Sequence, residues 1–390
     1  MRYIAPEQVM RDRFRNGRKP DWHTAILCFR DRSGSDTLVR ELGAEPLGYK
    51  VLWGMDECLT HQVEISGQLV GVIGRCEWGG PQTAILVEEL AHLGVLNVIG
   101  LGMAGSIVEN LPKGSLVVAA SALTTDGTSR HYEGFPSAHP DEELLSAAIE
   151  AAQRLRLPFR QATAVTADAI YRETDEVVRR WAEQGAEMVN METAPLYAAS
   201  SRCGLRSIWV GHISDCLVGD RWDGWDANAE DPARATVKLA VQLLEVMAER
   251  GTHTVCTRET FRPYRIEGLR WWATDEWEEA YKAHKGTWPH TTWFPEDLWR
   301  ELYSNGYRYC SLLVNGQGVA TAGLWPRTEK VWEVIAVGTG PDFRKKGYGK
   351  AVVSFVTQTI LNAGKVARLT FRKGNIPMER IAAALGYEAR

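Results

Sequence analysis

The chain has 390 residues, which at roughly 150 residues per domain predicts two or three domains and excludes a single small module. Hydrophobic residues make up 45% and charged residues 24%, so the composition is that of a folded protein and excludes a disordered chain. The formal net charge of −4, from 45 basic and 49 acidic residues, excludes a whole-protein positive field that would recruit nucleic acid or an anionic membrane.

The seven cysteines are scattered and form no C-x-x-C pair and no Cys/His pattern with zinc-ligand spacing. They predict reduced thiols and no metal site. No stretch approaches the ~18 uninterrupted apolar residues of a membrane span, and the arginine-rich residues 1–20 lack the apolar core of a signal peptide. We therefore expect a cytoplasmic protein with no membrane or nucleic-acid partner.

Strands and helices alternate through the first 250 residues. Short apolar runs bounded by glycine or polar residues predict buried strands, at 24–29, 69–74, 96–102, 115–121, 162–167 and 206–214. Apolar residues at helical spacing predict the helices between them, at 82–94, 141–155, 174–185, 193–204 and 233–250. This alternation predicts one three-layer α/β domain over residues 1–250, with a mainly parallel or mixed sheet.

A polar segment with glycine and proline, but with no helical or strand period, follows this region and predicts a linker over residues 251–264. Residues 265–390 predict a second, α+β domain. A tryptophan-rich helical section opens it, and a hairpin with Asn315-Gly316 as its turn follows. A strand, a glycine loop, a helix and a last strand–helix pair complete the predicted domain.

Five motifs of the first domain resemble, in their order along the chain, the nucleoside phosphorylase family one, which includes purine nucleoside and uridine phosphorylases and related nucleosidases. They are the segments 80–107 (GPQTAILVEELAHLGVLNVIGLGMAGSI), 126–132 (DGTSRHY), 166–171 (TADAIY), 186–200 (AEMVNMETAPLYAAS) and 212–215 (HISD). The resemblance covers about residues 20–250. It implies that this domain cleaves the N-glycosidic bond of a nucleoside-like substrate.

Cleavage of an N-glycosidic bond builds positive charge on the sugar and negative charge on the departing base, so the site needs carboxylates for the sugar hydroxyls and an acid for the base. The resemblance implies that Met191 and Glu192 hold the sugar and that Asp215 assists the leaving base. It also implies that Ile170 and Tyr171 lie beside the base.

Structural interpretations of the same residues stay open. Glu192 would suit a helix N-terminus, Asp215 a cap at the end of a strand, and Tyr171 a core position. His131 is a further candidate contact to the substrate, with an exposed or structural histidine as the alternative.

The phosphate ligands of the family are missing from this chain. Gly100 and Met103 stand where the resemblance implies an arginine and a hydroxyl, and the loop after the first strand reads CFRDRSGS over residues 28–35. Each lost donor or cation is worth roughly 1.5–3 kcal/mol to a bound dianion. Glu77 would repel phosphate and could orient water, so we expect hydrolysis rather than phosphorolysis.

Two alternatives remain for the first domain. It could be a catalytically inactive, nucleoside-binding or oligomer-forming platform. It could also be a true nucleoside phosphorylase whose phosphate ligands are relocated to Arg30, Arg32 or Arg75. Glu77 itself could be an exposed loop acid with no role in either reaction.

The main motif of the second domain is a glycine loop between a strand and a helix. Its R-x-x-G-x-G spacing resembles the pyrophosphate loop of the GCN5-related N-acetyltransferases (GNAT), carried here by Arg344, Lys345, Lys346, Gly347, Tyr348, Gly349 and Lys350. Glycines let consecutive backbone N–H groups turn toward one anion, and the following helix adds its positive N-terminal end. The resemblance implies acetyl-CoA as cofactor and an amine as acceptor.

Further positions follow from the same resemblance. Ala336 and Val337, at the end of the strand before the loop, and Asn375 would contact the coenzyme. Glu333 is the candidate base for the acceptor ammonium, with a sheet-face carboxylate paired to a cation as the alternative. The tyrosine acid of many relatives is replaced by Ala382. The tryptophans of residues 270–299 would line the acceptor pocket or belong to the core.

The sequence thus predicts a bifunctional enzyme with a three-layer α/β phosphorylase-like domain and an α+β acetyltransferase domain. An amino-sugar or nucleoside metabolite would connect the two activities. The resemblance implies a homo-oligomer, a dimer or a hexamer, and the arginine-rich N-terminal segment would suit a symmetric interface.

Overall fold

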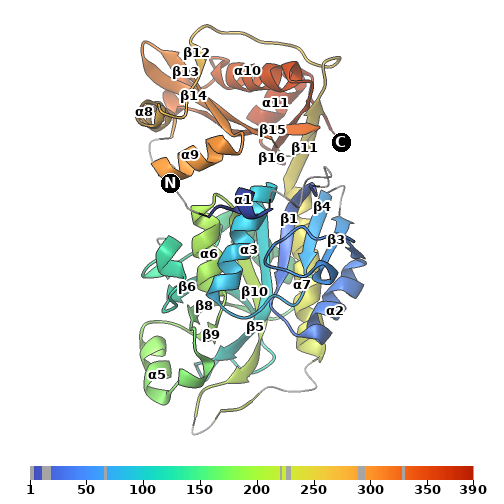
Figure 1. Ribbon diagram of the computed structural model, residues 1–390, viewed down its shortest axis with the longest axis vertical. Helices are drawn as coiled ribbons and strands as arrows, with labels where there is room; N and C mark the ends of the chain where they lie inside the picture. Colours follow the sequence, from blue (N-terminus) through green and yellow to red (C-terminus); the bar gives the residue numbers. More distant parts are fainter. Residues whose placement is uncertain are drawn as a thin grey trace. The chain divides into compact units, whose positions relative to one another are not determined.

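The computed structural model describes residues 4–10, 19–65, 68–132, 134–219, 222–224, 230–288, 295–326 and 330–389. The chain divides into two compact units, one that ends at Ala248 and one that begins at Glu249 (Figure 1). Each unit has its own sheet, its own helices and its own hydrophobic core.

The first unit is built on one mixed sheet. Its strands are β1 (Trp22–Cys28), β2 (Glu45–Pro46), β3 (Thr60–Ile65), β4 (Gln68–Ile73), β5 (Asn97–Ser106), β6 (Leu116–Thr124), β7 (Ser137–Ala138), β8 (Phe159–Thr166), β9 (Met188–Asn190) and β10 (Arg206–Cys216). Nine of them run in the order β10-β6-β8-β9-β5-β1-β4-β3-β2, and β7 pairs with β6 beside this path. Strand β10 also pairs with β5, which closes part of the sheet into a ring. The pairs β1–β4, β1–β5, β10–β5, β6–β8 and β8–β9 are parallel.

Helices cover both faces of this sheet (Figure 1). They are α1 (Pro6–Met10), α2 (Arg32–Leu42), α3 (Gly80–Leu93), α4 (Glu142–Arg154), α5 (Asp175–Glu183), α6 (Thr193–Arg202) and α7 (Glu230–Arg250), with short 3-10 turns η2 (Glu57–Leu59), η3 (Ser129–Tyr132) and η4 (Ile170–Arg172). One core cluster joins the sheet to α3 and α6, and a second joins it to α2, α4 and α7. The prediction of a three-layer α/β domain is confirmed.

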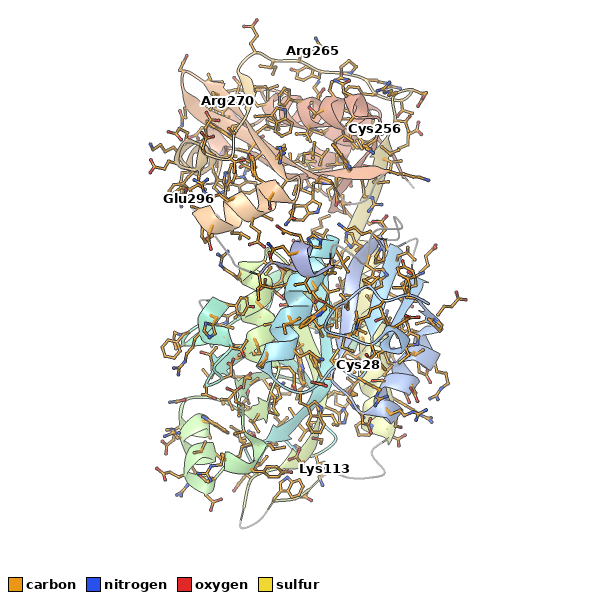
Figure 2. All side chains as sticks on the ribbon, in the orientation of Figure 1. Cys28, Lys113, Cys256, Arg265, Arg270 and Glu296 are labelled. Carbon is orange, nitrogen blue, oxygen red and sulfur yellow. The ribbon has the colours of Figure 1, made fainter. Side chains whose placement is uncertain are left out.

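Central strands are apolar on both sides because both faces are covered. Nine of the ten residues of β5 are buried, as are nine of the eleven residues of β10. This is why the sequence shows continuous apolar runs here instead of an alternating pattern. Cys28, which ends β1, belongs to the core between the sheet and helices α2, α4 and α7, and it lies inside the first unit in Figure 2.

The described residues of the second unit form seven strands. They are β11 (Gly251–Cys256), β12 (Leu269–Trp271), β13 (Arg308–Val314), β14 (Gln317–Pro326), β15 (Val331–Thr339), β16 (Val366–Arg372) and β17 (Glu388–Ala389), in the order β12-β13-β14-β15-β16-β11-β17. Its helices are α8 (Trp277–Thr287), α9 (Glu296–Ser304), α10 (Tyr348–Asn362) and α11 (Ile376–Leu385), with the turn η5 (Pro341–Phe343). The predicted α+β domain with Asn315-Gly316 as a hairpin turn is confirmed, since both residues have positive φ between the paired β13 and β14.

The predicted linker over 251–264 differs from the structure, because its first six residues form β11. This strand pairs with β16 from Gly251↔Arg372 to Cys256↔Ala367 and pairs with β17 on its other side. The polar sequence of this strand shows no strand pattern. Thr254 is nevertheless buried, and its hydroxyl donates to the Leu369 carbonyl oxygen at 2.9 Å. Figure 2 labels Cys256, at the end of this strand.

The tryptophan-rich section supplies core in the second unit. Trp272 and Trp299 are buried with Tyr303, Tyr307 and Tyr309 between the sheet and helices α8 and α9. A separate cluster lies between the sheet and helices α10 and α11. No helix in the described parts of the chain is long and apolar enough to cross a membrane.

Candidate active sites

A cavity of about 290 Å³ lies in the first unit, where the ends of β5, β9 and β10 meet the segment from η4 to α5. It is lined by Phe29, Trp78, Met103, Ala104, Gly105, Ile170, Tyr171, Glu173, Asp175, Val178, Val189, Asn190, Met191, Glu192, Ser214, Asp215, Leu217, Gly219 and Trp222. The cavity therefore brings together five residues that the sequence singled out, namely Ile170, Tyr171, Met191, Glu192 and Asp215.

Glu192 lies at the junction of β9 and α6 and is 4% exposed. It is the N-cap residue of α6, but its carboxyl group makes no capping hydrogen bond to that helix. The carboxyl group accepts instead from the backbone N–H groups of Met191, at 3.2 Å, and of Gly79. Burial raises the pKa of Glu192 to about 8 despite these two bonds.

Asp215 lies near the end of β10 and is held by two donors. The Ser214 hydroxyl donates to Oδ1 at 2.6 Å, and the Trp222 indole N–H donates to Oδ2 at 2.8 Å. Strand β5 passes close by, because a Cβ on Gly105 would lie 3.3 Å from Asp215 Oδ2 and 2.5 Å from Leu217 Cδ1. Glycine at this position of the motif keeps space open in front of the carboxylate.

Glu173 is a cavity residue that the sequence reasoning missed. It follows η4 and lines the same cavity as Asp215. Burial, and then the negative charge of Asp215, raises its pKa to about 7. The sequence offers one signal, namely that Glu173 lies two residues after Tyr171, the last residue of the TADAIY segment. Nothing in the neighbouring sequence indicates that Glu173 lies near Asp215.

Large aromatic side chains form the rim of the cavity. Trp78, Tyr171 and Trp222 line it and are 53%, 96% and 56% exposed. The exposure of Tyr171 excludes the core position that was its structural alternative. Rings that are exposed at the mouth of a cavity suit the stacking of a flat ligand.

The charged residue types among the described residues that line the cavity are all acidic. Glu173, Asp175, Glu192 and Asp215 contribute carboxyl groups, and no basic side chain lines the cavity among the described residues. Met103 lines the cavity where the hydroxyl was expected. At Gly100, a Cβ would lie 2.7 Å from Leu196 Cδ2 and 2.8 Å from Trp209 Cδ1, so an arginine has no room.

The three arginines considered as relocated phosphate ligands lie elsewhere, since none of them lines the cavity. Arg30 folds over Gly34, where a Cβ would lie 2.9 Å from its Nε, and it lowers the pKa of buried His212 as the second cause after burial. Arg32 is exposed on α2 and pairs with Asp36 at 3.6 Å. Arg75 is exposed.

Two sequence candidates do not line the cavity. Glu77 is exposed, and its backbone N–H donates to Gln82 Oε1 at 2.5 Å. His131 is exposed in η3. Their proposed roles stay predictions. No group of three or more His, Cys, Asp or Glu side chains in the described ranges is arranged to hold a metal ion.

The glycine loop of the second unit ends at the N-terminus of α10. Gly347 is the N-cap residue, with φ of +82°, and no side chain caps the helix there. A Cβ on Gly347 would lie 2.5 Å from the Tyr264 hydroxyl oxygen, and one on Gly349 would lie 3.0 Å from Thr339 Oγ1. Lys345 also has a positive φ, of +62°. The loop therefore has the backbone shape that presents N–H groups to an anion.

Cations surround this loop. Arg344, Lys345 and Lys346 precede Gly347, while Tyr348 and Lys350 lie in the first turn of α10. The Lys350 ammonium lies 3.6 Å from the ring centre of Tyr264, and the Lys346 ammonium lies 5.2 Å from that of Phe343. Bases at a helix N-terminus suit a bound pyrophosphate.

Strands β15 and β16 pair only from Val331↔Val366 to Val334↔Leu369. Beyond Val334, β15 continues alone with β14 through an irregularity at Ala336, which has φ of +50°, and Val337. Glu333 is 1% exposed just before this separation, opposite Arg368 in the register of β16. The separation leaves backbone groups of Ala336 and Val337 without a partner on β16.

Asn375 has a visible structural role, because it is the N-cap residue of α11 and its Oδ1 accepts from the Met378 N–H at 3.3 Å. Ala382, in α11, is buried. Tyr387 is also buried and shares a 2.6 Å hydrogen bond with the Thr357 hydroxyl.

Comparisons with known proteins agree with this division. The model of the phosphorylase superfamily matches residues 38–248, and that of the GNAT acetyltransferase family matches residues 266–387. A guanosine phosphorylase of Halorubrum lacusprofundi is 33% identical over 169 residues, which are 42% of this chain and 70% of that protein. A DeoD-type purine nucleoside phosphorylase of Clostridium perfringens is 31% identical over 176 residues, 44% of this chain and 73% of that protein.

A solved structure shows the same fold. The purine nucleoside phosphorylase of Toxoplasma gondii in complex with immucillin-H superposes with a TM-score of 0.52 at 21% identity, covering 59% of this chain and 94% of that one. The part of this chain that superposes is therefore about as long as the first unit.

Proposed function

The chain belongs to the phosphorylase superfamily through residues 38–248 and continues into a GNAT acetyltransferase domain, and from this membership we propose a bifunctional small-molecule enzyme. The first unit hydrolyses the N-glycosidic bond of a nucleoside-like substrate. The second unit transfers the acetyl group of acetyl-CoA to an amine. The relatives named as guanosine and purine nucleoside phosphorylases favour a purine nucleoside for the first reaction.

One observation carries the choice of water over phosphate. The cavity holds four carboxyl groups and, among the described residues, no basic side chain. A phosphate dianion needs cations or several donors, and the described lining offers it no basic side chain. Water carries no charge, so the same surroundings admit it.

The cavity residues have two proposed roles, one toward the sugar and one toward the base of the substrate. Glu192, whose carboxyl group burial keeps mostly protonated at neutral pH, forms hydrogen bonds with the sugar hydroxyls. Asp215, held by Ser214 and Trp222, stands at the base end. Tyr171 and Trp222 cover the base by stacking. Glu77 as the residue that orients water stays a prediction.

The second unit fits acetyl-CoA. The N-terminus of α10, the left-handed Gly347 and the lysines around it would hold the pyrophosphate. The backbone groups of Ala336 and Val337, which have no partner on β16, would hold the pantetheine arm. Bound acetyl-CoA supplies the thioester that is attacked. Glu333 would take the proton of the acceptor ammonium. Because Ala382 replaces the tyrosine acid, solvent would supply the last proton.

The experiment is incubation of the full chain with guanosine, inosine, adenosine and uridine, in phosphate buffer and in phosphate-free buffer, with base and sugar products separated by chromatography. We expect equal base release in both buffers, with the free sugar as product. Glu192→Gln should slow the reaction on the order of 10²–10⁴-fold, because an amide replaces the carboxyl group that holds the sugar hydroxyls.

Glu176→Gln is the matched control, since Glu176 is exposed and does not line the cavity. It should keep the wild-type rate. Sugar 1-phosphate as the main product would contradict hydrolysis and restore phosphorolysis. No base release from any of the four nucleosides would leave the first unit as an inactive binding platform.

A further inference from the structure

The base end of the cavity contains two carboxyl groups, and their surroundings differ. Asp215 comes from the end of β10, and Glu173 comes from the segment between η4 and α5. Both line the cavity, and they are near enough for the charge of Asp215 to act on the ionisation of Glu173. The two groups therefore line one cavity within range of each other's charge.

Both carboxyl oxygens of Asp215 are occupied by donors of the protein. Oδ1 accepts from the Ser214 hydroxyl at 2.6 Å, and Oδ2 accepts from the Trp222 indole at 2.8 Å. Neither oxygen is therefore left without a hydrogen-bond partner to meet the base.

Glu173 has the opposite surroundings. It is half-buried, and no side-chain or backbone donor of the described residues contacts its carboxyl group. The neighbouring negative charge of Asp215 favours its neutral form. Burial and this neighbouring charge together favour a Glu173 that carries a proton.

We propose that Glu173 delivers the proton to the departing base, while Asp215, whose two oxygens are occupied by Ser214 and Trp222, lies beside it and favours the protonated form of Glu173. This assignment rests on the proposed function, since it names the acid of the same hydrolysis. The pKa of Glu173, raised to about 7 by burial and by Asp215, supports it, because a group that titrates near neutral pH both holds and releases a proton there.

The step balances as follows. The glycosidic C–N bond breaks, and its electron pair stays with the base while a ring nitrogen of the base takes the proton of the Glu173 carboxyl group. The oxygen of one water molecule forms the new bond to the anomeric carbon. A proton of that water returns to the Glu173 carboxylate through solvent, so one water is consumed and the enzyme is regenerated.

This role makes Glu173 necessary only when the base needs a proton. A neutral purine leaves as an anion unless it is protonated. A purine methylated at N7 already carries the positive charge that protonation would give, and it leaves as a neutral molecule. The dependence of the rate on Glu173 should therefore vanish with an N7-methylated substrate, which a purely structural or binding role would not produce.

The test compares guanosine with 7-methylguanosine in phosphate-free buffer at pH 7, for the full-length wild type, Glu173→Gln and the control Glu176→Gln. Glu176 lies three residues further along, is exposed and does not line the cavity. We expect Glu173→Gln to lower kcat for guanosine by on the order of 10²-fold, with less than about a 3-fold change for 7-methylguanosine. Both rates of the control should match the wild type.

Other outcomes overturn the assignment. An equal loss on both nucleosides would make Glu173 a binding or positioning residue, and wild-type kcat of Glu173→Gln on guanosine would leave the proton with Asp215. A wild type that releases no base from either nucleoside would overturn the proposed function itself. That result appears in the wild-type measurement alone and is thereby distinct from a failure of the variant.

Discussion

Glu192 is a buried carboxyl group whose ionisation opposes the folding of the first unit. Burial raises its pKa from an ordinary value of 4.5 to about 8. Between these two values the folded state binds a proton that the unfolded state releases, so the contribution of the neutral group to stability is complete below about pH 4.5 and is lost as the pH rises through 8. Replacement by a neutral isostere should remove this dependence.

We expect Glu192→Gln to stabilise the first unit relative to the wild type at pH 8.5, and much less at pH 5.5. The gain in the free energy of unfolding on substitution should be larger at pH 8.5 than at pH 5.5 by on the order of 3 kcal/mol, at 1.36 kcal/mol per pKa unit. Thermal unfolding followed by circular dichroism measures it. A difference in Tm that is the same at both pH values would contradict a buried, protonated Glu192, and Glu176→Gln should show no pH-dependent difference.

Gly347 combines a left-handed backbone with a close neighbour. Its φ is +82°, and a Cβ would lie 2.5 Å from the Tyr264 hydroxyl oxygen at the N-terminus of α10. Gly347→Ala should therefore displace the loop and weaken the binding of acetyl-CoA at least about 10-fold, since the left-handed region alone costs roughly 1–2 kcal/mol for an alanine. Titration calorimetry on the full chain measures the affinity.

Gly364→Ala is the matched control for this variant. Gly364 has a similar φ, +75°, but a Cβ there would meet no atom within 4 Å. It should carry the same backbone strain and keep the wild-type affinity. Unchanged affinity in Gly347→Ala would place the coenzyme away from this loop. Base release should be unaffected in both variants, because the cavity belongs to the other unit.

At the scale of the elements, β11 is the main difference between the predicted and the observed second unit. Without β11, β16 would expose six paired positions on one edge, and β17 would lose its partner in the sheet. Cys256 and Thr254 would also leave the core. A sheet edge with unpaired backbone groups is a site of aggregation.

We therefore expect a fragment of residues 249–390 to fold and a fragment of residues 257–390 to fail. The longer fragment should show one cooperative thermal transition, and the shorter one should show none or precipitate. Circular dichroism and size-exclusion chromatography of the two fragments decide the point. Cooperative unfolding of 257–390 at the same Tm would show that β11 is dispensable.

Two strand–helix junctions carry the candidate sites. In the first unit, β9 ends where α6 begins, and this junction holds Glu192. In the second unit, the loop after β15 leads into α10, and this junction holds Gly347. Helix N-termini supply free backbone N–H groups in both places. Among the described residues, only the second junction is surrounded by cations. This agrees with the proposal that a pyrophosphate binds at the second junction and that phosphate does not bind in the cavity of the first unit.

At the scale of the whole molecule, the two candidate sites belong to units with separate cores. We therefore expect a substitution in one candidate site to leave the reaction proposed for the other unchanged. The predicted homo-oligomer, a dimer or a hexamer, stays a prediction. The arginine-rich N-terminal segment invoked for it falls partly outside the described residues.

The sequence by itself determined both families, the alternation of strands and helices in the first unit and the Asn315-Gly316 hairpin. These features depend on residues that are close together in the chain, so hydrophobic period, turn residues and motif spacing reveal them. The sequence also singled out five residues that the cavity brings together, although their roles stay predictions.

Only the tertiary structure decided what surrounds those residues. It placed Glu173 beside Asp215, it bound both oxygens of Asp215 to Ser214 and Trp222, and it left the cavity without a basic side chain among its described residues. It also inserted β11 between β16 and β17. Proton affinity, burial and strand pairing depend on neighbours from distant parts of the chain, and local sequence carries no record of which neighbours these are.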